Sequence, residues 1–170
     1  MVLELNYADI KKFDIANAPK VSCTIFFSGC THNCNGCFNK EVQNFNYGKP
    51  FTEEVMDYFI GLAKNEQVKN ICILGGEPFQ QDLYIMLEFL KRLRDEVNKP
   101  IWVWSGYIYE EIIRDSNKTK LLEYIDVLID GRFQLDKRDL TLRFRGSSNQ
   151  RVIDVKKTLK NKSIELFEIS

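Results

Sequence analysis

The sequence predicts an α/β fold with a mostly parallel sheet, in the form of a partial (open) βα barrel of about five or six units. Short apolar, β-rich segments alternate with segments of helical periodicity along the chain. Strands and helices that alternate in this way form βαβ units with parallel strands. A complete eight-fold barrel needs about 250 residues, and this chain has 170.

The strands are predicted where apolar runs are short, rich in β-branched or aromatic residues, and often followed by glycine or serine. In chain order these are residues 21–27 (VSCTIFF), 70–74 (NICIL), 101–105 (IWVWS), 126–130 (DVLID) and 151–155 (RVIDV). The alternating tail, residues 163–169 (SIELFEI), is a predicted edge strand.

The helices are predicted between these strands, where apolar residues recur at spacings of three and four. Thr52 has the residue type of an N-cap and begins the run TEEVMDYFIGLAKN, so the first helix starts there. The second covers residues 82–97, and two shorter ones cover 107–115 and 119–124.

Composition excludes several classes of protein. Lys plus Arg and Asp plus Glu each number 24, so no global basic field favours nucleic acid. The first residues lack a secretory signal, and no apolar run reaches the roughly 20 residues that span a bilayer. No linker divides the chain. We therefore expect a single domain over residues 1–170, a cytoplasmic location, and no nucleic-acid or membrane partner.

The strongest chemical signal is the loop CTHNCNGC at residues 30–37, which follows the first predicted strand. Cys30, Cys34 and Cys37 are three of only five cysteines, and in a reducing compartment such a cluster indicates a metal or redox site. Thiolates ligate iron–sulfur clusters, and a cubane normally takes four. Three cysteines would leave one iron open to a small molecule, as catalytic metal sites require.

Two other interpretations of this loop stay open on the residues alone. The three cysteines could bind zinc with His32, the only histidine, as fourth ligand, although structural zinc usually draws ligand pairs from separated segments. They could also be unligated thiols. We expect His32 to be a residue near the site rather than a ligand. Cys23 and Cys72, inside predicted strands, are expected to be small buried apolar residues.

A second motif, Gly75-Gly76-Glu77-Pro78, follows the strand at residues 70–74. Two glycines allow a tight turn and a close backbone approach, and the Glu77 carboxylate can accept hydrogen bonds from an ammonium group. Pro78 stiffens the turn. By itself the motif is equally compatible with a plain strand-to-helix turn.

Two further strand ends carry polar residues. Ser105 ends the third predicted strand, and its hydroxyl could face a ligand or cap the next helix. Asp130 and Arg132 end the fourth, where they could be structural or face a partner protein. Because ligands gather at the carboxyl ends of parallel strands, we expect all four strand ends to surround one site.

The spacing C-x3-C-x2-C followed by Phe38 resembles the signature of the radical S-adenosylmethionine superfamily. The resemblance implies a radical SAM core in which Cys30, Cys34 and Cys37 hold a [4Fe–4S] cluster. The amino and carboxylate groups of S-adenosylmethionine would bind its fourth iron. Gly36, Cys37 and Phe38 would line the adenine side, the GGEP motif would hold the ammonium group, and Ser105 would face the ribose or carboxylate.

Longer sequence segments resemble one particular family within this superfamily. SGCTHNCNGCFN, GGEP, WVWSGY, DVLIDGRF and RGSSNQR together resemble the family of anaerobic ribonucleoside-triphosphate reductase activating proteins, from about residue 22 to 155. The resemblance implies a glycyl-radical activase. The cluster, reduced by a flavodoxin or ferredoxin, would cleave S-adenosylmethionine, and the 5′-deoxyadenosyl radical would take a hydrogen from a glycine of the large reductase subunit. It also implies a possible homodimer.

Alternatives remain at this point. Another small radical enzyme, such as a different glycyl-radical activase or a carboxy-deazaguanine synthase, would share the first two motifs. A non-catalytic zinc or electron-transfer module would share only the cysteines. RGSSNQR alone is also a plausible polar loop. Relatives often have glycines where this chain has residues 16–19 (ANAP), and the tail after Leu159 matches no motif.

Overall fold

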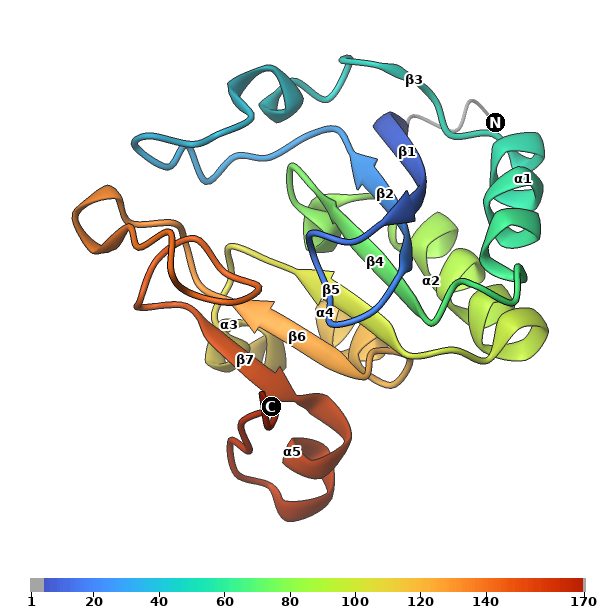
Figure 1. Ribbon diagram of the computed structural model, residues 1–170. Coiled ribbons are helices and arrows are strands. Elements are labelled where there is room, and N and C mark those ends of the chain that lie inside the picture. Colours follow the sequence, from blue (N-terminus) through green and yellow to red (C-terminus); the bar gives the residue numbers. More distant parts are fainter. Residues whose placement is uncertain (1–4, 170) are drawn as a thin grey trace.

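A computed structural model of the chain describes residues 5–169 (Figure 1). The described strands form one open sheet of seven strands in the order β3-β1-β2-β4-β5-β6-β7. The strands are β1 (Asn6–Asp14), β2 (Ser22–Phe27), β3 (Lys49–Pro50), β4 (Asn70–Gly75), β5 (Ile101–Trp104), β6 (Val127–Asp130) and β7 (Arg151–Asp154). The α-helices are α1 (Glu53–Ala63), α2 (Leu83–Arg92), α3 (Tyr109–Arg114), α4 (Ser116–Leu122) and α5 (Val155–Asn161).

The centre of the sheet is parallel and its two sides are antiparallel. β2, β4, β5 and β6 pair in parallel, whereas β1 and β3 on one side and β7 on the other pair antiparallel. The prediction of an α/β fold with a mostly parallel sheet is therefore confirmed in the middle of the sheet. All five predicted core strands match to within one residue at each end.

The sheet is open, as expected, but the predicted partial barrel of five or six βα units is not confirmed, because only four of the described strands pair in parallel and both sides of the sheet are antiparallel. The reason lies in the connections. Residues 15–21 join β1 to β2 and are too few for a crossover, so these strands run antiparallel. The loop between β6 and β7 folds back at the edge where β6 ends, so β7 also reverses direction.

The predicted helices form, with changes at their ends. Thr52 caps α1 as expected, since its Oγ1 accepts a hydrogen bond from Val55 N–H at 3.2 Å. The helix predicted over residues 82–97 is α-helical to Arg92 and continues as a wider π turn to Val97. β1, β3 and α5 were not predicted. The predicted edge strand in the tail is reduced to one bridge between Ile153 and Leu166.

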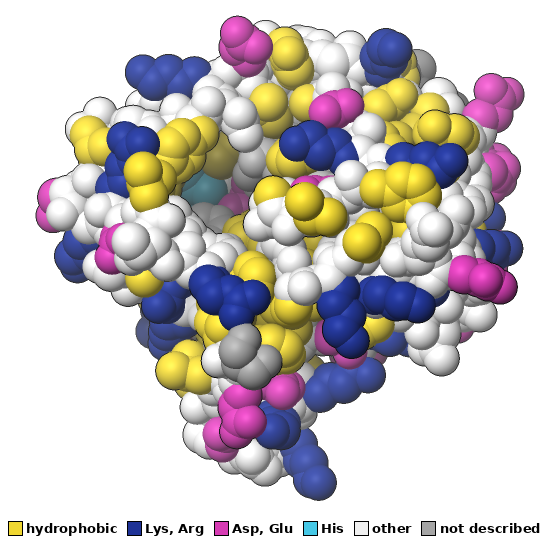
Figure 2. Space-filling view, viewed as in Figure 1, with side chains coloured by type: hydrophobic (Ala, Val, Ile, Leu, Met, Phe, Trp, Pro, Cys, Tyr) yellow, Lys and Arg dark blue, Asp and Glu magenta, His cyan; other side chains and the backbone are white. Residues whose placement is uncertain are grey.

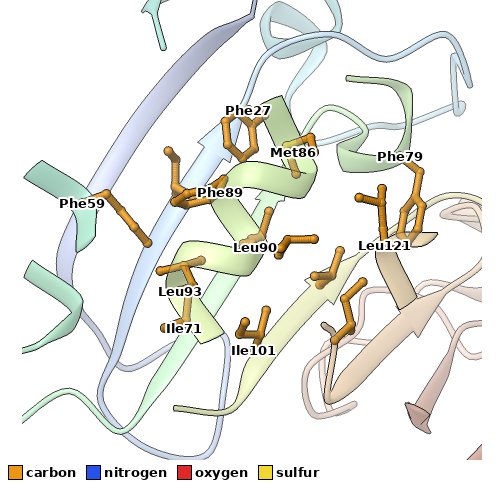
Figure 3. Close-up of a cluster of buried hydrophobic side chains, with 14 of the residues drawn as sticks. Phe27, Phe59, Ile71, Phe79, Met86, Phe89, Leu90, Leu93, Ile101 and Leu121 are labelled. Carbon is orange, nitrogen blue, oxygen red and sulfur yellow. The ribbon is translucent and has the colours of Figure 1, made fainter. Parts of the chain in front are cut away.

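The main core lies between the helices and one face of the sheet (Figures 1 and 3). Phe89 of α2 lies at its centre and makes edge-on ring contacts with Phe27, Phe51 and Phe59 at centroid distances of 6.0, 5.2 and 5.4 Å. This packing holds α1 and α2 against β2 and β4, whose carboxyl ends carry the two predicted motifs.

The other face of the sheet carries a smaller cluster around Trp102, packed by Phe144 and Phe167. Cys72 belongs to this cluster and Cys23 to the main core, so the two lie on opposite faces. Both are fully buried, and burial raises the pKa of each thiol to about 12. They are small buried residues, as expected. No helix in the described part of the chain is long and apolar enough to cross a membrane.

Candidate functional site

The carboxyl ends of β2, β4, β5 and β6 surround one cavity of about 410 Å³. Figure 1 shows the cysteine loop after β2 and the loops after β6 on either side of this edge of the sheet. In Figure 2 the opening is a hollow bordered by apolar side chains, with the cyan histidine side chain inside it. The volume suits a ligand of nucleoside size.

The structure brings all three loop cysteines to this cavity. Cys30, Cys34 and Cys37 line it and are partly buried. The loop is held to the segment that follows it, because Gly29 N–H donates to Val42 O at 2.7 Å and Cys30 N–H to Gln43 O at 3.1 Å. The expectation that the strand ends converge on one site is therefore met for the cysteine loop.

Burial raises the pKa of the Cys30 thiol to about 11, although the His32 backbone N–H donates to its sulfur. Burial also raises the pKa of Cys34, against a hydrogen bond from the Phe133 backbone. A metal ligand must be a thiolate, so metal binding here releases protons and strengthens as pH rises.

The donor set of three thiols suits an iron–sulfur cluster. Among residues 5–169, no three Cys, His, Asp or Glu side chains lie at the spacing that one metal ion requires. The three thiols line the same cavity. The His32 imidazole, the fourth ligand of the zinc alternative, contacts Glu77 at 2.6 Å. These residues would hold a [4Fe–4S] cluster by three thiolates and leave one iron without a protein ligand.

The GGEP glycines are required by the close packing of β4 against β2. Gly75 has φ of +139°, and a Cβ on it would lie 2.1 Å from Phe27 O. A Cβ on Gly76 would lie 2.4 Å from Gly29 O. The backbones are joined by bonds from Gly76 N–H to Phe27 O (2.8 Å) and from Glu77 N–H to Gly29 O (2.7 Å). Both glycines line the cavity.

Glu77 and Pro78 lie outside the cavity lining. Both are buried, and Pro78 begins the short 3-10 turn Pro78–Gln80. The Glu77 carboxylate is fully buried and turned toward donors from three segments rather than toward the opening. Their predicted contact with a ligand remains a prediction, and the structure gives Glu77 a different set of partners.

Gly36 also lies outside the cavity lining. It has φ of +76°, and a Cβ on it would meet Leu135 at 2.9 Å, so it allows the cysteine loop to pack on the loop after β6. Phe38 does line the cavity; the residue is 62% exposed, and its ring centroid lies 5.1 Å from that of Phe133. Ser105 lines it too, but its hydroxyl bonds both Glu77 oxygens and accepts from Tyr107 N–H.

Asp130 and Arg132 have structural partners. Asp130 is fully buried and accepts hydrogen bonds from Tyr109 N–H at 2.7 Å and from the Arg151 guanidinium at 2.6 Å. It therefore joins β6 to α3 and β7. Arg132 forms an ion pair with Glu111 at 3.0 Å, and this ion pair holds the pKa of Glu111 below its usual value.

The RGSSNQR segment is an ordered wall of the cavity. Gln150 Oε1 accepts from Gly146 N–H at 2.9 Å, and Gln150 Nε2 donates to Gly131 O at 3.0 Å. Asn149 Nδ2 donates to Arg132 O at 2.8 Å. Arg145, Gly146 and Gln150 line the cavity. Hydrogen bonds therefore join this segment to the loop after β6. The sequence alone did not predict where in the fold the segment lies.

Other lining residues were missed. Trp104 and Phe144 form an aromatic side, joined by a hydrogen bond from Trp104 Nε1 to Phe144 O at 2.7 Å. Asn17 also lines the cavity and donates a hydrogen bond to Asp14. Burial acts to raise the pKa of Asp14, but hydrogen bonds from Ala16 N–H, Asn17 and Thr24 outweigh it and leave the pKa lowered. Trp104 lies within a predicted strand, but the strand pattern did not indicate which face of the sheet its side chain occupies.

The three cysteines of the loop after β2 line the cavity at the carboxyl ends of the parallel strands, and thiolates are the ligands of iron–sulfur clusters. In agreement, residues 16–153 match the family described as a 4Fe-4S single cluster domain. This match covers the three cysteines, GGEP and RGSSNQR.

Similarity to curated proteins identifies the particular family within this class of iron–sulfur proteins. The chain is 41% identical to the anaerobic ribonucleoside-triphosphate reductase-activating protein of Pasteurella multocida (strain Pm70), over 86% of this chain and 95% of the relative. It is 39% identical to the protein of that name from Escherichia coli (strain K12), over 86% and 96%, and 30% identical to that of Enterobacteria phage T4, over 87% and 93%. The chain belongs to the family of anaerobic ribonucleoside-triphosphate reductase-activating proteins.

Proposed function

We propose that this chain is an activase that cleaves S-adenosylmethionine reductively at a [4Fe–4S] cluster and generates a glycyl radical on anaerobic ribonucleoside-triphosphate reductase. The observation that carries the proposal is the meeting of three thiols and two glycines, Gly75 and Gly76, at one cavity. Membership in the activating-protein family supports the same function.

The residues that line the cavity would each have a separate role in this reaction. Cys30, Cys34 and Cys37 would hold the cluster, and the open iron would face the cavity that Gly75 and Gly76 border. The backbone carbonyls of such glycines accept hydrogen bonds from an ammonium group without a side chain in the way. Phe38 would offer an aromatic surface to adenine, and the Trp104 side would exclude water.

Held by Cys30, Cys34 and Cys37, the cluster would supply one electron for cleavage of the sulfur–C5′ bond of S-adenosylmethionine, and this chemistry would lead to removal of a hydrogen atom from a reductase glycine. The cavity is open at one side, so a partner protein can cover it. A flavodoxin or ferredoxin as electron donor, a homodimer and a cytoplasmic location remain predictions from the resemblance and from composition.

The test is anaerobic reconstitution with iron and sulfide, followed by dithionite, S-adenosylmethionine and the large reductase subunit. We expect 5′-deoxyadenosine and the electron paramagnetic resonance signal of a glycyl radical on the subunit. The variant Cys34→Ser should lose both, since it removes one of only three cluster ligands. A fully loaded wild-type chain that gave neither product would refute the proposal. Deoxyadenosine without a radical on this reductase would point to a different glycyl-radical partner.

A further inference from the structure

Three strand ends meet on one buried carboxylate. Glu77 follows β4, and its Oε1 lies 2.6 Å from His32 Nε2 in the cysteine loop after β2. The same oxygen accepts from Gly106 N–H at 2.7 Å, after β5. Ser105 Oγ lies 3.0 and 2.9 Å from the two oxygens, and Phe79 N–H donates to Oε2 at 3.0 Å.

These contacts leave the carboxylate no free side toward the cavity. Glu77 is 0% exposed, and the His32 side chain that lines the cavity beside it is only 5% exposed. A buried charge is stable only when hydrogen bonds replace its hydration, and backbone N–H groups can only donate. A ligand ammonium group would reach Glu77 only by displacing His32.

The cysteine loop is attached to the same segment a second time. Thr31 N–H donates to Gln80 Oε1 at 2.9 Å, and Gln80 Nε2 donates back to Thr31 Oγ1 at 2.8 Å. Gln81 Nε2 donates to Gly29 O at 3.1 Å. Residues on both sides of Cys30 are therefore fixed by the segment that begins with Glu77.

We propose that Glu77 is a positioning residue, whose carboxylate fixes His32 and thereby holds the Cys30–Cys34 part of the loop in the shape that retains the cluster. His32 is the connecting group, because it lies between two of the three cysteines and contacts Glu77 directly. The inference rests on the cluster of the proposed function and is independent of the reaction and of the reductase.

The positioning role and a direct ligand contact predict different patterns. If Glu77 acts through His32, removing either group loosens the loop, and removing both adds little, because the two act as one unit. If Glu77 binds a ligand directly, His32 is dispensable for cluster retention and the two substitutions act independently.

The experiment measures how fast the reconstituted cluster releases iron to a chelator under anaerobic conditions. The variants are His32→Ala, Glu77→Gln and the double variant. Asp130→Asn is the matched control, since it removes the same charge from an equally buried carboxylate that contacts Tyr109 and Arg151 instead of the cysteine loop. The signal of the reduced cluster is recorded for each.

We expect iron release about fivefold or more faster in each single variant, as for a loss of about 1 kcal/mol in loop stability. The double variant should stay within about twofold of the faster single variant, and Asp130→Asn close to the wild type. Release at the wild-type rate in His32→Ala, or rates that multiply in the double variant, would overturn the inference. If Glu77→Gln does not fold, His32→Ala against Asp130→Asn decides.

The outcomes separate the two proposals. A wild-type chain that holds a cluster but makes no 5′-deoxyadenosine refutes the proposed function and leaves the iron-release comparison valid. A wild-type chain that takes up no cluster overturns both.

Discussion

The substitution Gly106→Ala probes the contact between His32 and Glu77 without touching either residue. Gly106 is not among the residues with positive φ, so alanine is acceptable to its backbone and only space is in question. A Cβ at this position would lie 2.4 Å from His32 Cδ2 and 2.8 Å from its Nε2. The imidazole must therefore move, and its 2.6 Å contact with the buried Glu77 is lost.

The expected cost follows from this contact. A hydrogen bond to a charged group contributes about 1.5–3 kcal/mol, and crowding in a packed interior costs about 1–3 kcal/mol. Because movement of His32 relieves the crowding, the two costs do not add in full, and we expect about 2–3 kcal/mol. For a chain of this size each kcal/mol lowers the melting temperature by about 2–4 °C, which gives a decrease of about 4–12 °C.

The assay is thermal and urea unfolding of the reduced, metal-free chain, so that metal binding does not add to stability. Gly61→Ala is the control, because a Cβ on this exposed helical glycine meets nothing within 4 Å. It should stabilise the protein by about 1 kcal/mol. In a His32→Ala background, Gly106→Ala should cost much less. Equal stability of Gly106→Ala and the wild type, or an unchanged cost in that background, would refute the reasoning.

Three further predictions concern the fold. Phe89→Ala should lower the free energy of unfolding by about 3–5 kcal/mol in urea titrations, since it empties the centre of the main core; a loss under about 1 kcal/mol would mean that the core can collapse around it. Thr52→Ala should cost about 1 kcal/mol through the lost cap of α1, and Thr52→Ser should restore it. Asp14→Asn should cost most near neutral pH. The lowered pKa of Asp14 means that its stabilisation is complete above the unfolded value of about 3.9 and disappears as pH falls through the folded value. A cost that stays constant between about pH 7 and 3 would contradict this assignment.

Much of the fold could be predicted from local patterns. The parallel strands are continuous apolar runs between turn residues, and each is correct to within one residue at either end. β1 was missed because its sequence, NYADIKKFD, is half-exposed and polar, and its pairing with β2 is a long-range property. The partial (open) barrel was predicted from the alternation of strands and helices and from the chain length, but the direction of each strand depends on its connections. Residues 15–21 are too few for a crossover, and this is what makes that side of the sheet antiparallel.

The site was predictable in its location and in its thiols, but less so in the direction of each side chain. Strand order brings Cys30 and Gly76 together, and that follows from parallel pairing. Ser105 was expected to face a ligand or cap a helix; it lines the cavity, but its hydroxyl bonds Glu77, and it is not the cap of α3, which begins at Tyr109. Periodicity does not encode such choices, because they depend on which donors the tertiary structure leaves near a buried charge.

The Glu77 carboxylate gives a physical reason for the motifs to occur together. The glycines before it let β4 approach β2 so closely that a Cβ on Gly76 would meet Gly29 O at 2.4 Å. Because the strands lie this close, the Glu77 carboxylate contacts both His32 and the turn after β5. Gly106 in that turn has no side chain, so the His32 imidazole fits beside it. A side chain at Gly76 or Gly106, or the loss of His32, would each leave the same buried charge short of a partner. The cysteine loop, GGEP and SGY thus form one hydrogen-bonded unit, and a change in any of them should both speed iron release from the cluster and lower the stability of the fold.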